Sequence, residues 1–208
     1  MLVLISAVAA HAQDSTSHDT RIDGPVFQRG NYMATISAGF INGYRNEYSV
    51  PAGFEKGNAS GFVPVYIRGE YAVSDRVSIG IGFSFNTIMF NSFRLDSGHN
   101  GIIRRTATNR WRVFGGNLLA WYHFGHLLHI PRLDPFVGGG ICLNNISETA
   151  APSGDSTIAS TGHTATFMLR AGARYYISPM FSIFADAGYD KLSIFSLGMS
   201  CRFLPAKK

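Results

Sequence analysis

The sequence contains few charged residues, few cysteines and no long apolar run after its first dozen residues. Charged residues make up 15% of the 208 positions, and only Cys142 and Cys201 could form a disulfide. A membrane-spanning helix needs about 20 consecutive, mostly apolar residues, and no run after residue 12 approaches that length. The sequence therefore excludes a bundle of transmembrane helices.

Basic clusters are scarce as well. The net charge is +5, from 18 basic and 13 acidic residues, but the basic residues are scattered along the chain. The only doublets are Arg104-Arg105 and Lys207-Lys208. A nucleic-acid-binding surface gathers Lys and Arg on one face, so we expect no nucleic-acid partner.

Glycine and aromatic residues are abundant, with 23 Gly, 16 Phe and 9 Tyr, as is typical of strand-rich proteins. The clearest pattern is at 193–203, where polar and apolar residues alternate. A period of two predicts a β-strand with two unlike faces. The apolar face carries Phe195, Leu197, Met199, Cys201 and Phe203, and the other face carries Ile194, Ser196, Gly198, Ser200 and Arg202.

Seven earlier segments share this alternation, which predicts eight strands. In the segment 110–124 the alternation slips near Gly115-Gly116, and we interpret this slip as a β-bulge. The predicted strands are 32–40, 61–73, 77–87, 110–124, 135–145, 167–177, 181–189 and 193–203.

The connections between these strands alternate in length. We expect long loops at 43–60, 91–109 and 147–163 and shorter connections elsewhere, including 190–192. Outer-membrane barrels have long external loops and short periplasmic turns. The pattern predicts an all-β fold, an eight-stranded antiparallel up-and-down transmembrane β-barrel with both ends on the periplasmic side.

The N-terminus has features of an export signal. An apolar run leads to Ala10-His11-Ala12, which has the small-x-small pattern of a cleavage site. We therefore predict a signal peptide at 1–12, a mobile periplasmic tail at 13–31, the barrel at 32–203 and a C-terminal tail at 204–208.

Two phrases, Tyr-Tyr-Ile-Ser-Pro at 175–179 and Asp-Pro-Phe-Val-Gly-Gly-Gly at 134–140, accompany these eight strands. With them, the chain resembles the small bacterial outer-membrane β-barrel family of the OmpA and OmpX type over residues 32–203. The resemblance implies a place in the bacterial outer membrane, with outer-membrane lipid and the barrel-assembly machinery as partners. It also implies that Phe203 is the aromatic residue that this machinery recognises.

If the apolar faces meet lipid, the polar faces fill a lumen that is just wide enough for side chains. Charges in such a place must be paired. Equal distance from the turn at Pro179 places Asp186 opposite Gly172, so we predict an ion cluster of Asp186 with Arg170 and Arg174, in which Glu70 serves Arg68 or reaches across the lumen. The predicted lumen holds more arginine than acid: Arg68, Glu70, Arg112, Arg170, Arg174, Asp186 and Arg202.

Three functions fit these features. The first is a structural or surface-interaction barrel whose lumen is plugged by the ion cluster and whose loops 43–60 and 91–109 contact an external ligand. The second is a narrow pore for small solutes or ions. The third is a soluble calyx of the lipocalin type, which would place its large apolar residues inside and its arginines outside.

Candidate chemical groups are few. His123, His126 and His129 are spaced three residues apart. On a strand, side chains at that spacing point to alternate faces and diverge, so they do not form a metal site. His163 with Ser160, and His99 with Ser97 and Asp96, are the candidates for a lipid acyltransferase or deacylase site, but they lie in predicted loops that nothing holds in place. We therefore expect no catalysis, no cofactor and no metal. Cys142 faces the predicted lumen and Cys201 the lipid, so we expect no disulfide.

Overall fold

The computed structural model describes residues 27–46, 48–50, 52–98, 101–128, 130, 132–152 and 158–203. The predicted signal peptide, residues 13–26 of the predicted tail and the C-terminal tail lie outside the described residues. Within the described ranges, no helix is long and apolar enough to cross a membrane. These ranges contain one 3-10 helix, η1 (Gly43–Asn46), and the strands β1 (Tyr32–Phe40), β2 (Glu55–Gly61), β3 (Val65–Ala72), β4 (Val77–Gly98), β5 (Gly101–His123), β6 (Leu133–Pro152), β7 (Ile158–Tyr176), β8 (Phe181–Tyr189) and β9 (Phe195–Phe203).

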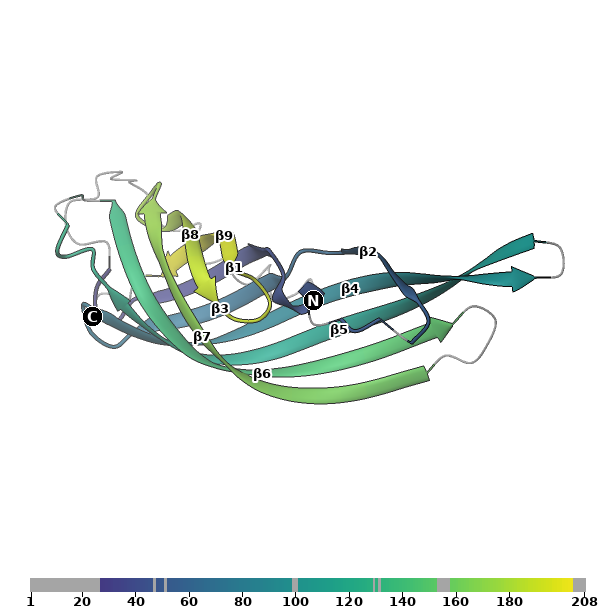
Figure 1. The fold of residues 1–208 in the computed structure, drawn as a ribbon. Coiled ribbons are helices and arrows are strands. Elements are labelled where there is room, and N and C mark those ends of the chain that lie inside the picture. Colours follow the sequence, from purple (N-terminus) through teal and green to yellow (C-terminus); the bar gives the residue numbers. More distant parts are fainter. Residues whose placement is uncertain are drawn as a thin grey trace, which may run out of the picture.

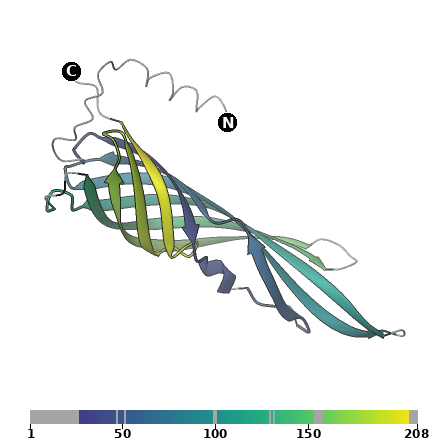
Figure 2. The same cartoon turned by 90° about the horizontal axis from the view of Figure 1, so that it is seen from above.

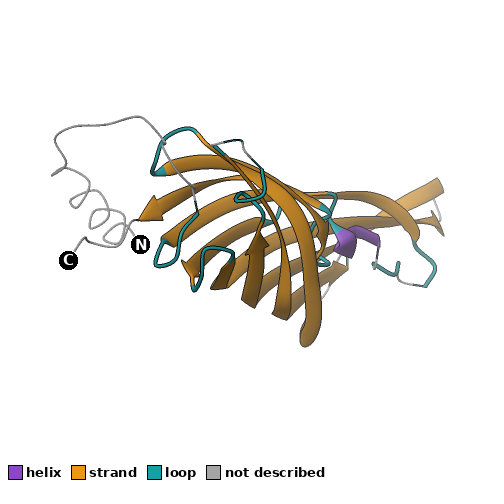
Figure 3. Ribbon diagram, turned by 90° about the vertical axis from the view of Figure 1, so that its left-hand side faces the viewer, coloured by secondary structure: helices purple, strands orange, loops and turns teal. Residues whose placement is uncertain are grey.

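Eight of these strands form a closed antiparallel ring. The order β3-β1-β9-β8-β7-β6-β5-β4 is closed by the pairing of β4 with β3, and the ninth strand, β2, pairs only with β4. The first strand meets the last, with Tyr32 opposite Phe203. Figure 3 shows the strands curving into one wall. The predicted fold class, an eight-stranded antiparallel up-and-down barrel, is confirmed.

The wall has an apolar outside and a polar inside. Ile36, Ile81 and Phe167 are 51, 56 and 65% exposed, whereas Glu70 and Arg170 are 5 and 1% exposed. Side chains alternate between the two faces of a strand, so every ring strand contributes to both surfaces. A lipocalin-type calyx requires the reverse arrangement, and that alternative is wrong.

Strands replace much of what we predicted as loops. Hairpin β4–β5 pairs without interruption from Val77↔Tyr122 to Gly98↔Gly101, and β6–β7 likewise reaches Ala150↔Ile158. Figure 1 shows these four strands continuing far beyond the ring. In their described parts, the predicted loops at 91–109 and 147–163 are therefore wrong. The pattern missed these strands because a strand with water on both faces needs no alternation of polar and apolar residues and so shows no period of two.

The predicted loop at 43–60 contains two elements. Its first part forms η1, and its last part forms most of β2, which pairs with β4 from Glu55↔Phe93 to Gly61↔Ile88. Figure 2 shows the extended strands leaving the barrel on one side only. We call this end of the barrel the hairpin end, and the opposite end, where β1 begins and β9 finishes, the turn end.

The predicted bulge at Gly115-Gly116 is also wrong. Both glycines lie in unbroken register, opposite Ser84 and Phe83 on β4 and opposite Asn144 and Leu143 on β6. The slip in the pattern has another cause: Val113 and Leu119 are apolar but buried on the inner face. In the sequence, an apolar residue on the inner face looks like an outward-facing residue, so the alternation shows an apparent change of face there.

The last residues of the predicted mobile tail pack onto the turn end. The backbone N–H of Gly30 donates to the carbonyl of Ala72, and that of Ala72 donates to the carbonyl of Asn31. The side chain of Phe27 is 4% exposed and stacks on the ring of His123, with ring centroids 3.6 Å apart. Residues 27–31 are therefore part of the barrel.

Candidate functional site in the lumen

The lumen contains balanced charge. Among the described residues, four arginines and four carboxylates are buried there, so the predicted excess of arginine is wrong. Two acids at strand ends, which the sequence pattern had assigned to connections, join the predicted set, and Arg112 lies outside it. The set is Arg68, Arg170, Arg174, Arg202, Glu70, Asp134, Asp186 and Asp190.

A central cluster is built around Arg170 on β7. Its Nε donates to Oδ1 of Asp186 at 2.7 Å, and its Nη1 donates to Oδ2 of Asp190 at 2.5 Å. Arg68 on β3 reaches across and places its Nη1 3.3 Å from Oδ2 of Asp186. The hydroxyl of Ser196 also donates to Asp186. Asp186 is thereby bonded from three directions.

A glycine makes room for this cluster. Gly172 lies opposite Asp186, in the register that the turn at Pro179 predicts. A methyl group at position 172 would lie 2.7 Å from Cβ of Asp186, closer than two carbon atoms can pack. The absence of a side chain therefore lets the carboxylate sit between the strands that carry its arginine partners.

A second cluster lies toward the turn end. Nη2 of Arg174 lies 3.3 Å from Oε1 of Glu70, and Nη1 lies 3.9 Å from Oδ2 of Asp134. Asp134 is also bonded to His123, whose Nδ1 lies 2.8 Å from Oδ2. The other ring nitrogen of His123 lies 3.1 Å from the hydroxyl oxygen of Ser78.

The pairing differs in part from our expectation. Arg170 meets Asp186, as predicted, and Glu70 on β3 reaches across the lumen to Arg174 on β7, the second of the two roles predicted for it. Arg174 lies near Glu70 and Asp134 instead of Asp186, and Arg68 meets Asp186 instead of Glu70. The reason is that Asp134 lies on β6 directly opposite Arg174, so a carboxylate is available at that level without reaching diagonally to Asp186.

Two predicted lumen arginines have other surroundings. Arg112 is exposed and points outward from β5, since its neighbour Val113 is fully buried; its predicted place in the lumen is wrong. Arg202 is buried at the turn end, where its Nε donates to the carbonyl of Pro179 at 2.8 Å and its guanidinium lies 5.1 Å from the ring centroid of Tyr176.

Sequence reasoning missed Asp134, Asp190 and His123 as lumen residues. Asp190 belongs to the short connection at 190–194, whose backbone turns inward: its Oδ1 accepts from the N–H groups of Leu192 and Ser193. A usable signal did exist. Because buried charges must be paired, an excess of arginine in the predicted lumen requires further acids close to the strand ends.

Aromatic residues close the lumen at the hairpin end. Tyr48, from the segment after η1, stacks on Phe90 with ring centroids 4.2 Å apart, and the edge of Trp111 meets both rings. Tyr44 and Leu192 belong to the same buried cluster. The loop that enters from β1 therefore folds back over the barrel opening.

Ser78, His123 and Asp134 have the bond order of a hydrolase triad, yet their surroundings do not suit one. The three residues are at most 1% exposed, and Phe27 covers the imidazole. Catalysis needs a substrate carbonyl beside the serine and donors for the oxyanion. An ester cannot reach Ser78, and the chain of bonds belongs to the buried charge cluster around Arg174.

The other candidate groups are dispersed. His123 is buried, the ring of His126 lies 6.5 Å from that of Tyr122, and His129 lies outside the described residues. His163 and Ser160 are exposed on β7. Among the described residues no three His, Cys, Asp or Glu side chains could hold a metal ion.

The predicted site with Asp96 is an ion pair on the hairpin extension, by which we mean β2 and the parts of the hairpins β4–β5 and β6–β7 that continue beyond the ring. Oδ2 of Asp96 accepts from Nη2 of Arg94 at 2.9 Å and lies 2.9 Å from Nε of Arg105. The hydrogen bond from Arg94 holds the pKa of the Asp96 carboxyl below its ordinary value, and the charges of Arg94 and Arg105 lower it further. His99 lies outside the described residues, and the side chain of Ser97 is not described.

Both cysteines are free thiols. Cys142 on β6 is buried on the lumen side, and Cys201 on β9 is partly buried. Two strands, β7 and β8, separate β6 from β9 in the ring.

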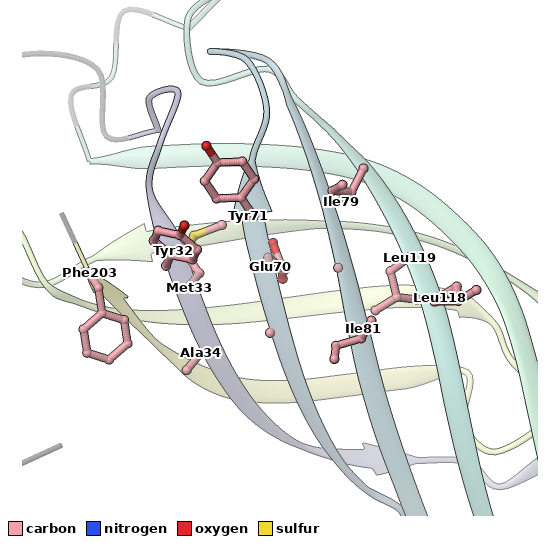
Figure 4. A pocket seen from close by; sticks show the side chains of 12 residues that line it. Tyr32, Met33, Ala34, Glu70, Tyr71, Ile79, Ile81, Leu118, Leu119 and Phe203 are labelled. Carbon is pink, nitrogen blue, oxygen red and sulfur yellow. The ribbon is translucent and has the colours of Figure 1, made fainter. Parts of the chain in front are cut away.

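The outer wall carries an apolar groove of about 640 Å³ near the turn end. Figure 4 shows it between the aromatic rings of Tyr32, Tyr71 and Phe203 on one side and Ile79 and Leu118 on the other. Ala34 and Gly69 form part of its floor, because a methyl group and a residue without a side chain leave a hollow between larger neighbours. Phe203 thus lies on the surface where the apolar wall ends.

No family model and no curated protein matches the chain. Among solved structures, it is similar to Ail, the attachment invasion locus protein of Yersinia pestis, in complex with the heparin analogue sucrose octasulfate: TM-score 0.47, 11% identity, 84% of this chain and 99% of that one. It is also similar to the N-terminal β-barrel domain of Pseudomonas aeruginosa OprF (0.42, 17%, 85% and 99%) and to OprG of the same organism (0.40, 12%, 88% and 100%).

Proposed function

We propose that the protein spans the outer membrane of a bacterium as a plugged barrel with a structural or surface-interaction role. Ring strands such as β1, β8 and β9 are nine residues long, which suits a tilted transmembrane strand of about 9–11 residues. Exposed Ile, Leu and Phe side chains on the wall would be costly in water, and in lipid they are the expected outer surface. Outer-membrane lipid is then the first partner.

The plug consists of the two charge clusters together with the aromatic residues at both ends. One observation carries this proposal: Phe27 closes the turn end, Arg174, Asp186 and Arg170 fill the middle, and Tyr48 closes the hairpin end. The central pairs are at most 5% exposed. Side chains that satisfy one another in this way leave an ion no open path along the axis.

The interaction surface is the extension formed by β2 and the hairpins β4–β5 and β6–β7. The segments 43–60 and 91–109, which we expected to contact an external ligand, contribute to it through β2 and through the ends of β4 and β5. A paired strand holds its side chains in place better than a free loop does, so a ligand would meet a preformed surface.

No catalysis is part of this proposal. Ser78 cannot be reached by an ester, and His163 is exposed on the extension. Lipid A extracted from cells that express the protein should have an unchanged mass spectrum. A change in acyl-chain number would identify the barrel as a lipid-modifying enzyme.

The placement in the membrane is tested by cell fractionation. The protein should occur in the outer-membrane fraction and should migrate differently on gels before and after boiling, since folded barrels resist detergent. Recovery in the soluble fraction without detergent would overturn the proposal.

Phe203→Ala tests the remaining prediction for the assembly machinery: it should lower the amount of folded protein in the membrane but not the refolding yield in detergent.

The plug is tested by conductance in planar lipid bilayers. The wild-type barrel should insert without producing large, stable single-channel steps. Such steps would instead support the alternative function, a narrow pore for ions or small solutes.

A further inference from the structure

Two arginines lie on the outer wall directly above its apolar part. Arg110 and Arg112 are exposed on β5 and point away from the barrel, because Trp111 and Val113 between and beside them face inward. Phe114, two residues below Arg112, is 55% exposed, and its ring stacks near that of Phe83 with centroids 6.2 Å apart. The two guanidinium groups therefore lie just beyond the aromatic residues with which the apolar wall ends toward the hairpin end.

Their neighbours on the wall are uncharged. Arg112 lies opposite Thr87 on β4 and Ser147 on β6, and Arg110 lies opposite Met89 and Thr149. Nη2 of Arg110 contacts the sulfur of Met89 at 3.8 Å. Within the described part of the chain, neither arginine has a carboxylate oxygen within 4.0 Å. The nearest acid along β6, Glu148, faces inward and bonds to Asn109.

This arrangement suits a phosphate group. Side chains two residues apart on one face of a strand are roughly 7 Å apart, so two guanidinium groups can approach one phosphate, or two neighbouring ones, with their paired N–H donors. The hydroxyl groups of Ser147, Thr87 and Thr149 add donors on both sides.

The height of the pair on the wall selects the kind of ligand. A lipid headgroup lies at the level where an apolar wall becomes polar, and its acyl chains would run down over Phe114 and Leu118, both exposed. Basic residues at this level attract anionic headgroups. We infer that Arg110 and Arg112 bind the phosphate groups of a phosphorylated membrane lipid in the leaflet at the hairpin end. The inference rests on the proposed placement of the barrel in the membrane.

The test measures lipid retention on the folded barrel. The full protein is folded into micelles of a short-chain phosphatidylcholine that contain lipid A, and bound lipid A is counted by native mass spectrometry over a range of lipid A concentrations. The variant is Arg110→Gln with Arg112→Gln. The matched control is Arg94→Gln with Arg105→Gln, which removes the same charge from the same hairpin on its other face.

The double variant should bind lipid A about 30-fold more weakly than wild type, since each arginine near a membrane surface contributes about 1 kcal/mol and 1.4 kcal/mol corresponds to tenfold. The control should bind like wild type. Equal loss in both variants, or no preference of the wild type for lipid A over phosphatidylcholine, would overturn the inference.

Two further measurements separate the other outcomes. Heat-modifiable migration in phosphatidylcholine vesicles alone reports whether each variant inserts; failure of the wild type there contradicts the membrane placement rather than the lipid site. If the double variant fails to fold, the test compares how tightly the wild type binds lipid A and dephosphorylated lipid A. Equal binding of the two would overturn the inference. A soluble sulfated polysaccharide that binds through Arg110 and Arg112 while lipid A does not would show that the partner is not a lipid.

Discussion

Arginines inside the barrel and arginines on its outer wall have opposite surroundings. Arg68, Arg170 and Arg174 are buried, each with a carboxylate oxygen within 3.3 Å, whereas Arg110 and Arg112 are exposed and, among the described residues, lie near no carboxylate. The two groups differ in height along the barrel. At the level of the apolar wall a charge can only be inside and paired, but above that level it can point outward.

This difference explains why residue type alone misplaced Arg112. Alternation between charged and apolar residues reports the inner face only where lipid surrounds the strand. The following predictions test whether burial and pairing, rather than the arginine side chain itself, make the two groups different.

The largest effect is expected for Asp186→Ala. This substitution leaves both Arg68 and Arg170 buried without their shared acceptor, and an unpaired buried charge costs about 3–5 kcal/mol. Urea-induced unfolding from phospholipid vesicles measures the loss. Asp96→Ala, which removes a more accessible carboxylate that also bonds to two arginines, should cost far less, because water screens an exposed ion pair. Similar losses for the two variants would contradict the comparison.

Glu70→Gln should have an intermediate effect. The amide keeps the shape of the side chain but withdraws the charge that faces Arg174 at 3.3 Å, while Asp134 remains nearby. We expect a loss of about 1–3 kcal/mol in the same unfolding assay. A loss as large as that of Asp186→Ala would mean that Asp134 does not share the charge of Arg174.

Arg112→Gln should leave the stability almost unchanged. The side chain is exposed and makes no ion pair with a described residue, so the change in unfolding free energy should stay within about 0.5 kcal/mol in phosphatidylcholine vesicles. Arg170→Gln, the matching change inside the lumen, should destabilise strongly. A large loss at position 112 would show that the wall arginine supports the fold.

The smallest effect concerns Asp96 and pH. Because its pKa is lowered in the folded protein by the hydrogen bond from Arg94, this carboxylate stabilises the fold at neutral pH, and the contribution is lost as the pH falls through the lowered pKa. Arg94→Gln should raise the midpoint of the Asp96 titration, measured by NMR. Arg45→Gln serves as the control and should leave that midpoint in place.

Sequence reasoning succeeded where lipid surrounds the strands. The bounds of β1 and β8 were predicted residue for residue, and the pairing of Gly172 with Asp186 followed from one tight turn. It failed in the hairpin extension, where water on both faces removes the alternation, and in β5, where the buried Val113 and Leu119 resemble outward residues.

The sequence by itself determined the eight ring strands, the closed barrel and the polar interior, because alternation and connection length are local properties that each segment carries alone. Only the tertiary structure decided which charges meet. Asp134 and Asp190 enter the lumen at strand ends, Arg68 reaches Asp186 from a distant segment of the chain, and Arg112 points outward. These outcomes depend on the register between strands and on the height of each residue in the closed ring, and both are set only when all eight strands pair together.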